Sequence, residues 1–127
     1  MVQKVSDAEL EIMKLVWENS PAVTLFPDLM EGLARRGRPC QKNTLIVLLS
    51  RLVNKGFLQA RKTGRRNEYT PLISEAEYQT VQTTQFLDKL YAGSVSGLVS
   101  QLITADLLTE GEYEELKQLL EKGRERP

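Results

Sequence analysis

Positively charged side chains gather around one turn near the middle of the chain, where they could bind a polyanion. Residues 61–66 hold four of them, at Arg61, Lys62, Arg65 and Arg66. Lys and Arg bind the phosphate groups of nucleic acids, and such contacts position a protein on a duplex without reading its sequence. The alternative is that these cations only keep an exposed strand edge soluble and unpaired.

The segment just before this turn, residues 43–57, is predicted to form an amphipathic helix. Its apolar face recurs at three- and four-residue steps, at Leu45, Leu48, Leu49, Leu52 and Val53. The opposite face carries Asn43, Ile46, Val47, Ser50 and Asn54. Asn pairs with adenine and aliphatic groups contact the thymine methyl, so this face suits the DNA major groove. The alternative is that Ile46 and Val47 merely widen the apolar face.

Two shorter helices are predicted to support this segment. The first begins with a capping box from Ser6 to Glu9 and ends near Asn19, before Ser20-Pro21. Val23 could pair briefly as a strand, and Thr24 is the expected N-cap of the second helix. The basic turn that follows either complements the helix C-terminus or touches phosphate, through Arg35, Arg36 and Arg38.

A β-hairpin is predicted after the amphipathic helix, which Gly56 ends. Leu58 and Ala60 alternate with polar residues, as in a half-buried strand. Tyr69 and Leu72 return on a second strand, which Pro71 should confine to an edge. Three helices followed by such a hairpin are the layout of a winged helix-turn-helix domain, here assigned to residues 1–73.

Residues 74–127 are predicted to form three further helices that are too short and too apolar to make a compact domain alone. The most economical way to bury their apolar side is against a second copy of the chain. The residues expected in this interface are Phe86, Leu87, Leu90, Tyr91, Val95, Leu98, Val99, Leu102, Leu116, Leu119 and Leu120. The alternative is a monomer in which these helices pack back on the winged domain.

The composition of the chain excludes several classes of function. The chain has 127 residues and a net charge of zero, but residues 1–73 carry +5 and residues 74–127 carry −5. It has no histidine, and Cys40 is its only cysteine, so His-based acid–base chemistry and a multi-cysteine metal site lack their residues. We therefore expect no enzyme, no cofactor and no metal. Without an apolar leader or membrane-spanning run, the expected location is the cytoplasm.

Four segments together resemble the penicillinase and methicillin-resistance repressors (the BlaI/MecI family). They are SDAELEIMKLVWENSPAV (6–23), TLIVLLSRLVNKGFL (44–58), GRRNEYTPL (64–72) and FLDKLYAGSVSGLV (86–99). The resemblance implies a mostly α-helical winged-helix homodimer that represses β-lactam resistance or related stress genes by binding a palindromic operator. It implies that the third helix enters the major groove and that wing cations contact phosphate. The DNA-facing residues of that helix would be Lys42, Asn43, Thr44, Ile46, Val47, Ser50 and Arg51.

The resemblance also implies a switch in which a membrane-bound sensor metalloprotease leads to cleavage of the dimerisation region. The bond that is cut in the family is typically Asn-Phe, and the matching pair here is Gln101-Leu102. The copper-responsive branch carries paired cysteines near its C-terminus, which this chain lacks. Two alternatives stay open: a protein-interaction module with the same fold, and a repressor of this family that answers a metal or redox signal.

Overall fold

The computed structural model describes residues 3–124. The chain divides into two compact units, Met1–Gln82 and Thr83–Pro127, and each is described by itself. This division lies inside a helix, and the functional boundary expected between residues 73 and 74 stays a prediction. None of the described helices is both long enough and apolar enough to cross a membrane.

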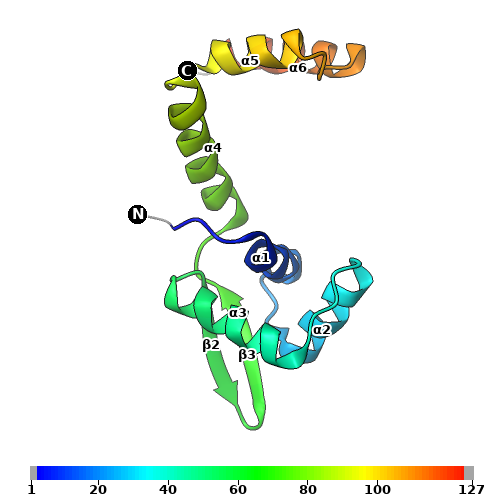
Figure 1. The fold of residues 1–127 in the computed structure, drawn as a ribbon, viewed down its shortest axis with the longest axis vertical. Helices are drawn as coiled ribbons and strands as arrows, with labels where there is room; N and C mark the ends of the chain where they lie inside the picture. The colour runs from blue at the N-terminus through cyan, green and yellow to red at the C-terminus, as the bar shows by residue number, and fades with distance from the viewer. Residues whose placement is uncertain (1–2, 125–127) are drawn as a thin grey trace. The chain divides into compact units, whose positions relative to one another are not determined.

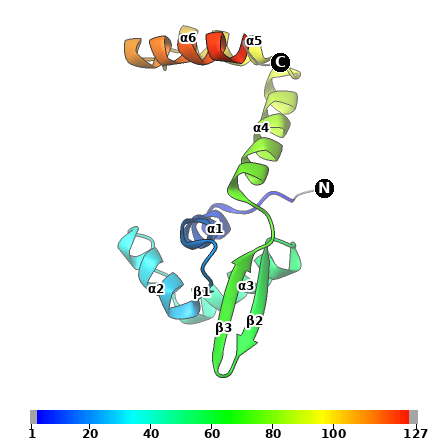
Figure 2. The same cartoon turned by 180° about the vertical axis from the view of Figure 1, so that it is seen from behind.

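The first unit is a winged helix-turn-helix domain, which confirms the predicted fold class (Figures 1 and 2). Antiparallel pairing places β3 between the other two strands, in the order β1-β3-β2. The elements in chain order are α1 (Asp7–Asn19), β1 (Thr24–Leu25), α2 (Phe26–Arg35), α3 (Lys42–Asn54), β2 (Leu58–Thr63), β3 (Arg66–Pro71) and the start of α4 (Glu75–Tyr91).

The core of this unit lies between the three helices and the base of the hairpin. Helix α3 contributes one face to it, through Leu45, Leu49 and Leu52, and Phe57 follows directly after the helix. Gly56, with φ of +82°, adopts the left-handed conformation that ends α3 at low steric cost. The capping box of Ser6 and Glu9 starts α1 as predicted.

Three residues predicted to be buried are exposed instead. Val53 is 37% exposed, and Ala60 and Leu72 are also on the surface. The reason for Ala60 is that the hairpin projects beyond the helices, so that in β2 only Leu58, at its base, is buried (Figure 2). Leu72 lies just past the end of β3, where the neighbouring Ile73 takes the buried position.

Three further predictions, on Val23, Thr24 and Pro71, were wrong. Thr24 does not cap α2; it is buried in β1, opposite Tyr69, and Leu25 stands at the helix start instead. The short strand is therefore Thr24–Leu25, and Val23 lies outside it. Pro71 does not confine β3 to an edge, because the proline is the last residue of that strand, beyond the residues that pair with β1.

The second unit comprises the rest of α4, α5 (Val95–Thr104) and α6 (Glu110–Arg124). Gly93, with φ of +80°, follows α4, and the hydroxyl of Ser94 caps α5. Thr109 and Glu112 form a capping box at the start of α6 through reciprocal hydrogen bonds of 3.1 and 3.2 Å. Among the side chains described between residues 83 and 123, none is buried, so the unit has no enclosed core of its own.

Candidate nucleic-acid interface

The outward face of α3 is exposed along its whole length. All seven of its predicted DNA-facing residues are exposed, at Lys42, Asn43, Thr44, Ile46, Val47, Ser50 and Arg51. Ile46 and Val47 are 48% and 49% exposed. They therefore do not belong to the core-facing side, which Leu45, Leu49 and Leu52 occupy. The helix thus presents small polar and aliphatic groups on a buried anchor, an arrangement that matches the base edges of the major groove.

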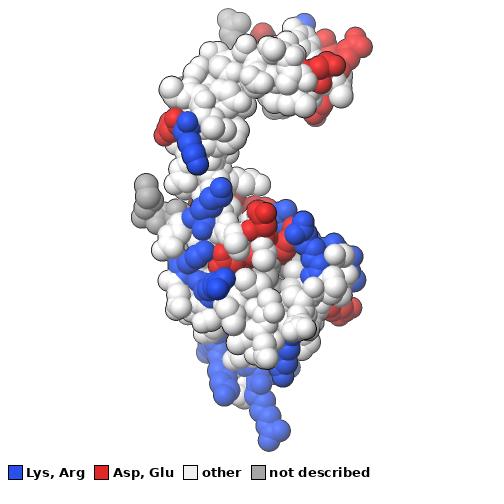
Figure 3. Space-filling model, viewed as in Figure 1, with Lys and Arg blue, Asp and Glu red and all other residues white. Residues whose placement is uncertain are grey.

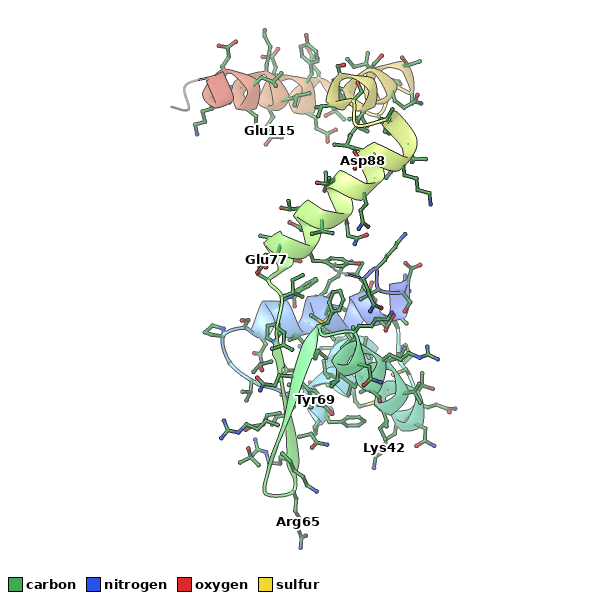
Figure 4. The ribbon with its side chains drawn as sticks, turned by 90° about the vertical axis from the view of Figure 1, so that its left-hand side faces the viewer. Lys42, Arg65, Tyr69, Glu77, Asp88 and Glu115 are labelled. Atoms are coloured by element: carbon green, nitrogen blue, oxygen red, sulfur yellow. The ribbon has the colours of Figure 1, made fainter. Side chains whose placement is uncertain are left out.

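The hairpin of β2 and β3 presents the second set of predicted residues. Thr63 pairs with Arg66 across a tight turn in which Gly64 has a φ of +65°. The four cations are all exposed, and Figure 4 shows Arg65 reaching outward from the tip. Within residues 3–124 no salt bridge occupies any of the four. These cations are Arg61, Lys62, Arg65 and Arg66. Lys and Arg side chains, drawn in blue in Figure 3, cover much of the hairpin.

The arginines at the end of α2 differ from those of the hairpin because two of them are paired with carboxylates. Arg36 forms salt bridges with Glu18 and, at 3.7 Å, with Glu11. Arg38 lies 3.9 Å from Glu11. These contacts hold the turn against α1, which favours a structural role for Arg36 and Arg38 over a phosphate contact.

A groove separates α3 from the hairpin and the start of α2. Its volume is about 920 Å³. The structure brings five predicted DNA-contacting residues together in its lining: Lys42, Ile46 and Ser50 from α3, with Arg65 and Arg66 from the hairpin. Tyr69, which Figure 4 labels on β3, also lines the groove. Burial raises the pKa of the Tyr69 hydroxyl, and a hydrogen bond with Asn67 partly offsets this.

An ion pair behind α3 was not predicted from the sequence. Glu9, only 1% exposed, accepts a 2.8 Å hydrogen bond from Nζ of Lys55, which follows the last residue of α3. Burial alone would raise the pKa of Glu9, but hydrogen bonds from Lys55 and Ser6 and the charge of Lys55 hold it below its ordinary value of 4.5. The capping-box pattern located Glu9, but nothing local indicated its partner 46 residues away.

The residues predicted for dimerisation all lie in the second unit or in α4. Five are exposed, namely Phe86, Leu90, Val95, Leu119 and Leu120, and six are half-buried, namely Leu87, Tyr91, Leu98, Val99, Leu102 and Leu116. The Gln101-Leu102 bond lies inside α5. In the part of the chain that the structure describes, no group of three His, Cys, Asp or Glu residues could hold a metal ion.

Comparison with known proteins matches residues 5–122 to the protein family described as "Penicillinase repressor". The chain is 35% identical over 125 residues to the penicillinase repressor of Bacillus licheniformis, covering 98% of this chain and 95% of the relative. It is 28% identical over 119 residues to the methicillin resistance regulatory protein MecI of Mammaliicoccus sciuri, covering 94% of each chain. The solution structure of the DNA-binding domain of the repressor BlaI aligns with a TM-score of 0.53 at 35% identity, over 61% of this chain and 92% of that domain.

Proposed function

The chain belongs to the penicillinase repressor family, a family of transcriptional repressors, and from this premise we propose that it is a homodimer that binds a palindromic operator in double-stranded DNA. One observation carries the proposal most directly. A single compact unit presents a largely uncharged, groove-compatible face on α3 beside a hairpin with four exposed cations. The first surface can read base edges, while the second can bind phosphates on the same duplex.

Dimerisation is supported by the apolar surface of the second unit. Eight large hydrophobic residues from α4 to α6 are at least 45% exposed, namely Phe86, Leu90, Val95, Ile103, Leu107, Tyr113, Leu119 and Leu120. The unit encloses no core among its described residues, so these apolar side chains are left in contact with water. Exposed apolar area of this kind is unfavourable and typically marks an interaction surface. A two-fold partner would cover these residues and would present two α3 helices to two half-sites.

The regulated genes are proposed to be β-lactam resistance genes, in keeping with the names of the relatives, which speak of penicillinase and of methicillin resistance. Repression would end when a membrane-bound sensor metalloprotease leads to a cut between Gln101 and Leu102. Cleavage inside α5 would remove part of the apolar surface that holds the dimer. Each monomer would then lose the avidity that comes from two linked half-sites.

A salt titration tests DNA binding. The full chain is titrated onto a duplex from its own promoter region and onto a random duplex, at several salt concentrations. We expect Arg65→Ala with Arg66→Ala to weaken binding to both duplexes and to flatten the slope of log affinity against log salt by about 0.9 for each phosphate that is no longer neutralised. Arg36→Ala is the matched control, because that arginine already pairs with Glu11 and Glu18. Equal, salt-insensitive binding to both duplexes would exclude the proposed function.

A second candidate function is a protein-interaction module. The exposed aliphatic pair Ile46 and Val47 favours it, since such residues also suit a protein groove. This function predicts that the chain does not shift its own promoter fragment in a gel. A shift that a random fragment fails to compete away would decide in favour of the repressor.

A further inference from the structure

The groove between α3 and the hairpin has two kinds of lining. One is apolar and includes Phe26, Val53 and Ala60, which no predicted DNA contact uses. The other is cationic and consists of Lys42, Arg65 and Arg66. Among the described residues that line the groove, none is an Asp or a Glu. The lining therefore selects for negative charge and for hydrocarbon at the same time.

A DNA backbone satisfies only half of this lining. Phosphate and sugar are hydrated and polar, so they would match the three cations but not the apolar side chains. The exposure of Val53, which the helical pattern predicted to be buried, adds to this apolar surface. The volume of about 920 Å³ lies in the range of ordinary small-molecule sites, which are mostly apolar with a few placed polar groups.

We propose that this groove binds a small amphipathic carboxylate, a molecule with one carboxylate group on a compact aromatic or branched hydrocarbon body. The carboxylate would pair with cations of the lining, and the body would contact Phe26, Val53 and Ala60. Such a ligand would cover Lys42, Ile46 and Arg65, so its binding and that of DNA would exclude each other. This last step rests on the proposed function, whereas direct binding of the ligand does not.

Direct binding is tested by NMR on the isotopically labelled full chain, with phenylbutyrate as the probe. We expect saturable shifts at the amides of Val53, Ala60 and Tyr69, with a dissociation constant of about 1 mM, as suits a ligand of this size. Acetate at the same ionic strength keeps the charge without the body, and phenylbutanol keeps the body without the charge. Each should bind at least about tenfold more weakly, because either half of the recognition is lost.

Two variants locate the site. Ala60→Phe fills the groove, and Val53→Ser removes apolar surface from it, so both should weaken phenylbutyrate binding at least about fivefold. Val23→Ser is the matched control, because Val23 is similarly exposed in the same unit but does not line the groove. Shifts confined to α5 and α6, shifts that acetate reproduces, or binding that Val53→Ser leaves unchanged would each overturn the proposal.

Competition is measured by the anisotropy of a labelled promoter duplex. Phenylbutyrate should release the duplex from the unaltered chain at concentrations where acetate does not, and Val53→Ser should blunt this release. Saturable binding without release would overturn the exclusion of DNA. If the chain bound no duplex at all, the proposed function would fail, while the NMR titration would still decide whether the groove holds the carboxylate.

Discussion

At the scale of single residues, Glu9 has two structural roles. Only the first of them, the capping box, was predicted from the sequence. Its carboxylate accepts a 2.8 Å hydrogen bond from the backbone N–H of Ser6, at the start of α1. It also accepts a 2.8 Å hydrogen bond from the ammonium group of Lys55, at the end of α3. The second oxygen, Oε2, is buried and has no hydrogen-bond partner within the described residues. The Glu9 carboxylate therefore stabilises the fold only while it is ionised and paired with Lys55.

Glu9→Gln tests this pairing through its pH dependence. Because the pKa of Glu9 is lower in the folded chain than its ordinary 4.5, the carboxylate contributes stability above pH 4.5, and this is lost as pH falls through the folded pKa. We expect the substitution to lower the free energy of unfolding by about 1–3 kcal/mol at neutral pH. The difference from the unaltered chain should shrink in acid. Urea unfolding at several pH values measures it.

Exposed Glu31 provides the control for this experiment. Glu31→Gln should change the free energy of unfolding by no more than about 0.5 kcal/mol at neutral pH. A gap between Glu9→Gln and the unaltered chain that stayed constant down to strongly acidic pH would contradict the role given to the ionised Glu9.

Asn43 belongs to the same scale because a single amide can discriminate one base pair. If it faces adenine, Asn43→Ala should cost about 1–3 kcal/mol on the operator and should relax the preference at one position of each half-site. Asn54→Ala is the control, since Asn54 lies on the same face of α3 but outside the predicted contact set. Binding of both variants to a library of operator sequences measures these effects. An unchanged sequence preference in Asn43→Ala would show that Asn43 does not contact a base.

At the scale of elements, the first turns of α4 are anchored on the core of the first unit. Tyr78 packs against Phe57 in an edge-on contact with ring centroids 5.4 Å apart, and against Trp17 at 5.8 Å. Its hydroxyl accepts the backbone N–H of Val5 at 3.2 Å. The indole of Trp17 donates to the carbonyl of Ile73 at 2.9 Å, just before α4 begins. The start of α4 is therefore an integral part of the first unit.

Tyr78→Phe measures the polar part of this anchor. The aromatic contacts remain, but the buried N–H of Val5 is left without its acceptor, so the free energy of unfolding should fall by about 1–3 kcal/mol. Tyr113→Phe is the control, because Tyr113 is 49% exposed. Denaturant unfolding of both variants provides the comparison. Equal stabilities would show that the Tyr78 hydroxyl is not needed to hold α4 on the domain.

At the scale of the whole molecule, dimerisation should depend on the apolar residues of the second unit. Leu120 is 63% exposed within the single chain. If a partner buries it, Leu120→Asp should raise the dimer dissociation constant at least about 100-fold, because each copy loses about 1.5 kcal/mol of apolar burial. Leu72→Asp, at a comparably exposed leucine of the first unit, should leave the constant unchanged. Analytical ultracentrifugation measures both, and a chain that stays monomeric at micromolar concentrations would contradict the homodimer.

The sequence by itself determined the elements of this protein, because caps, glycine stops and apolar periodicity act over only a few residues. The capping box at Ser6, the end of α3 at Gly56 and the outward face of that helix could all be predicted in this way. The winged-helix layout and the four hairpin cations were also predicted from the residues themselves, and the family resemblance implied the same arrangement.

The tertiary structure alone decided which of these residues meet. The partner of Glu9, the pairing of Arg36 and Arg38 with α1, and the exposure of Val53 and Ala60 follow from where helices and hairpin pack. The physical reason is distance along the chain. A periodic pattern states that a side chain is apolar or charged, but only packing between distant segments determines whether it is covered, paired or left lining a groove.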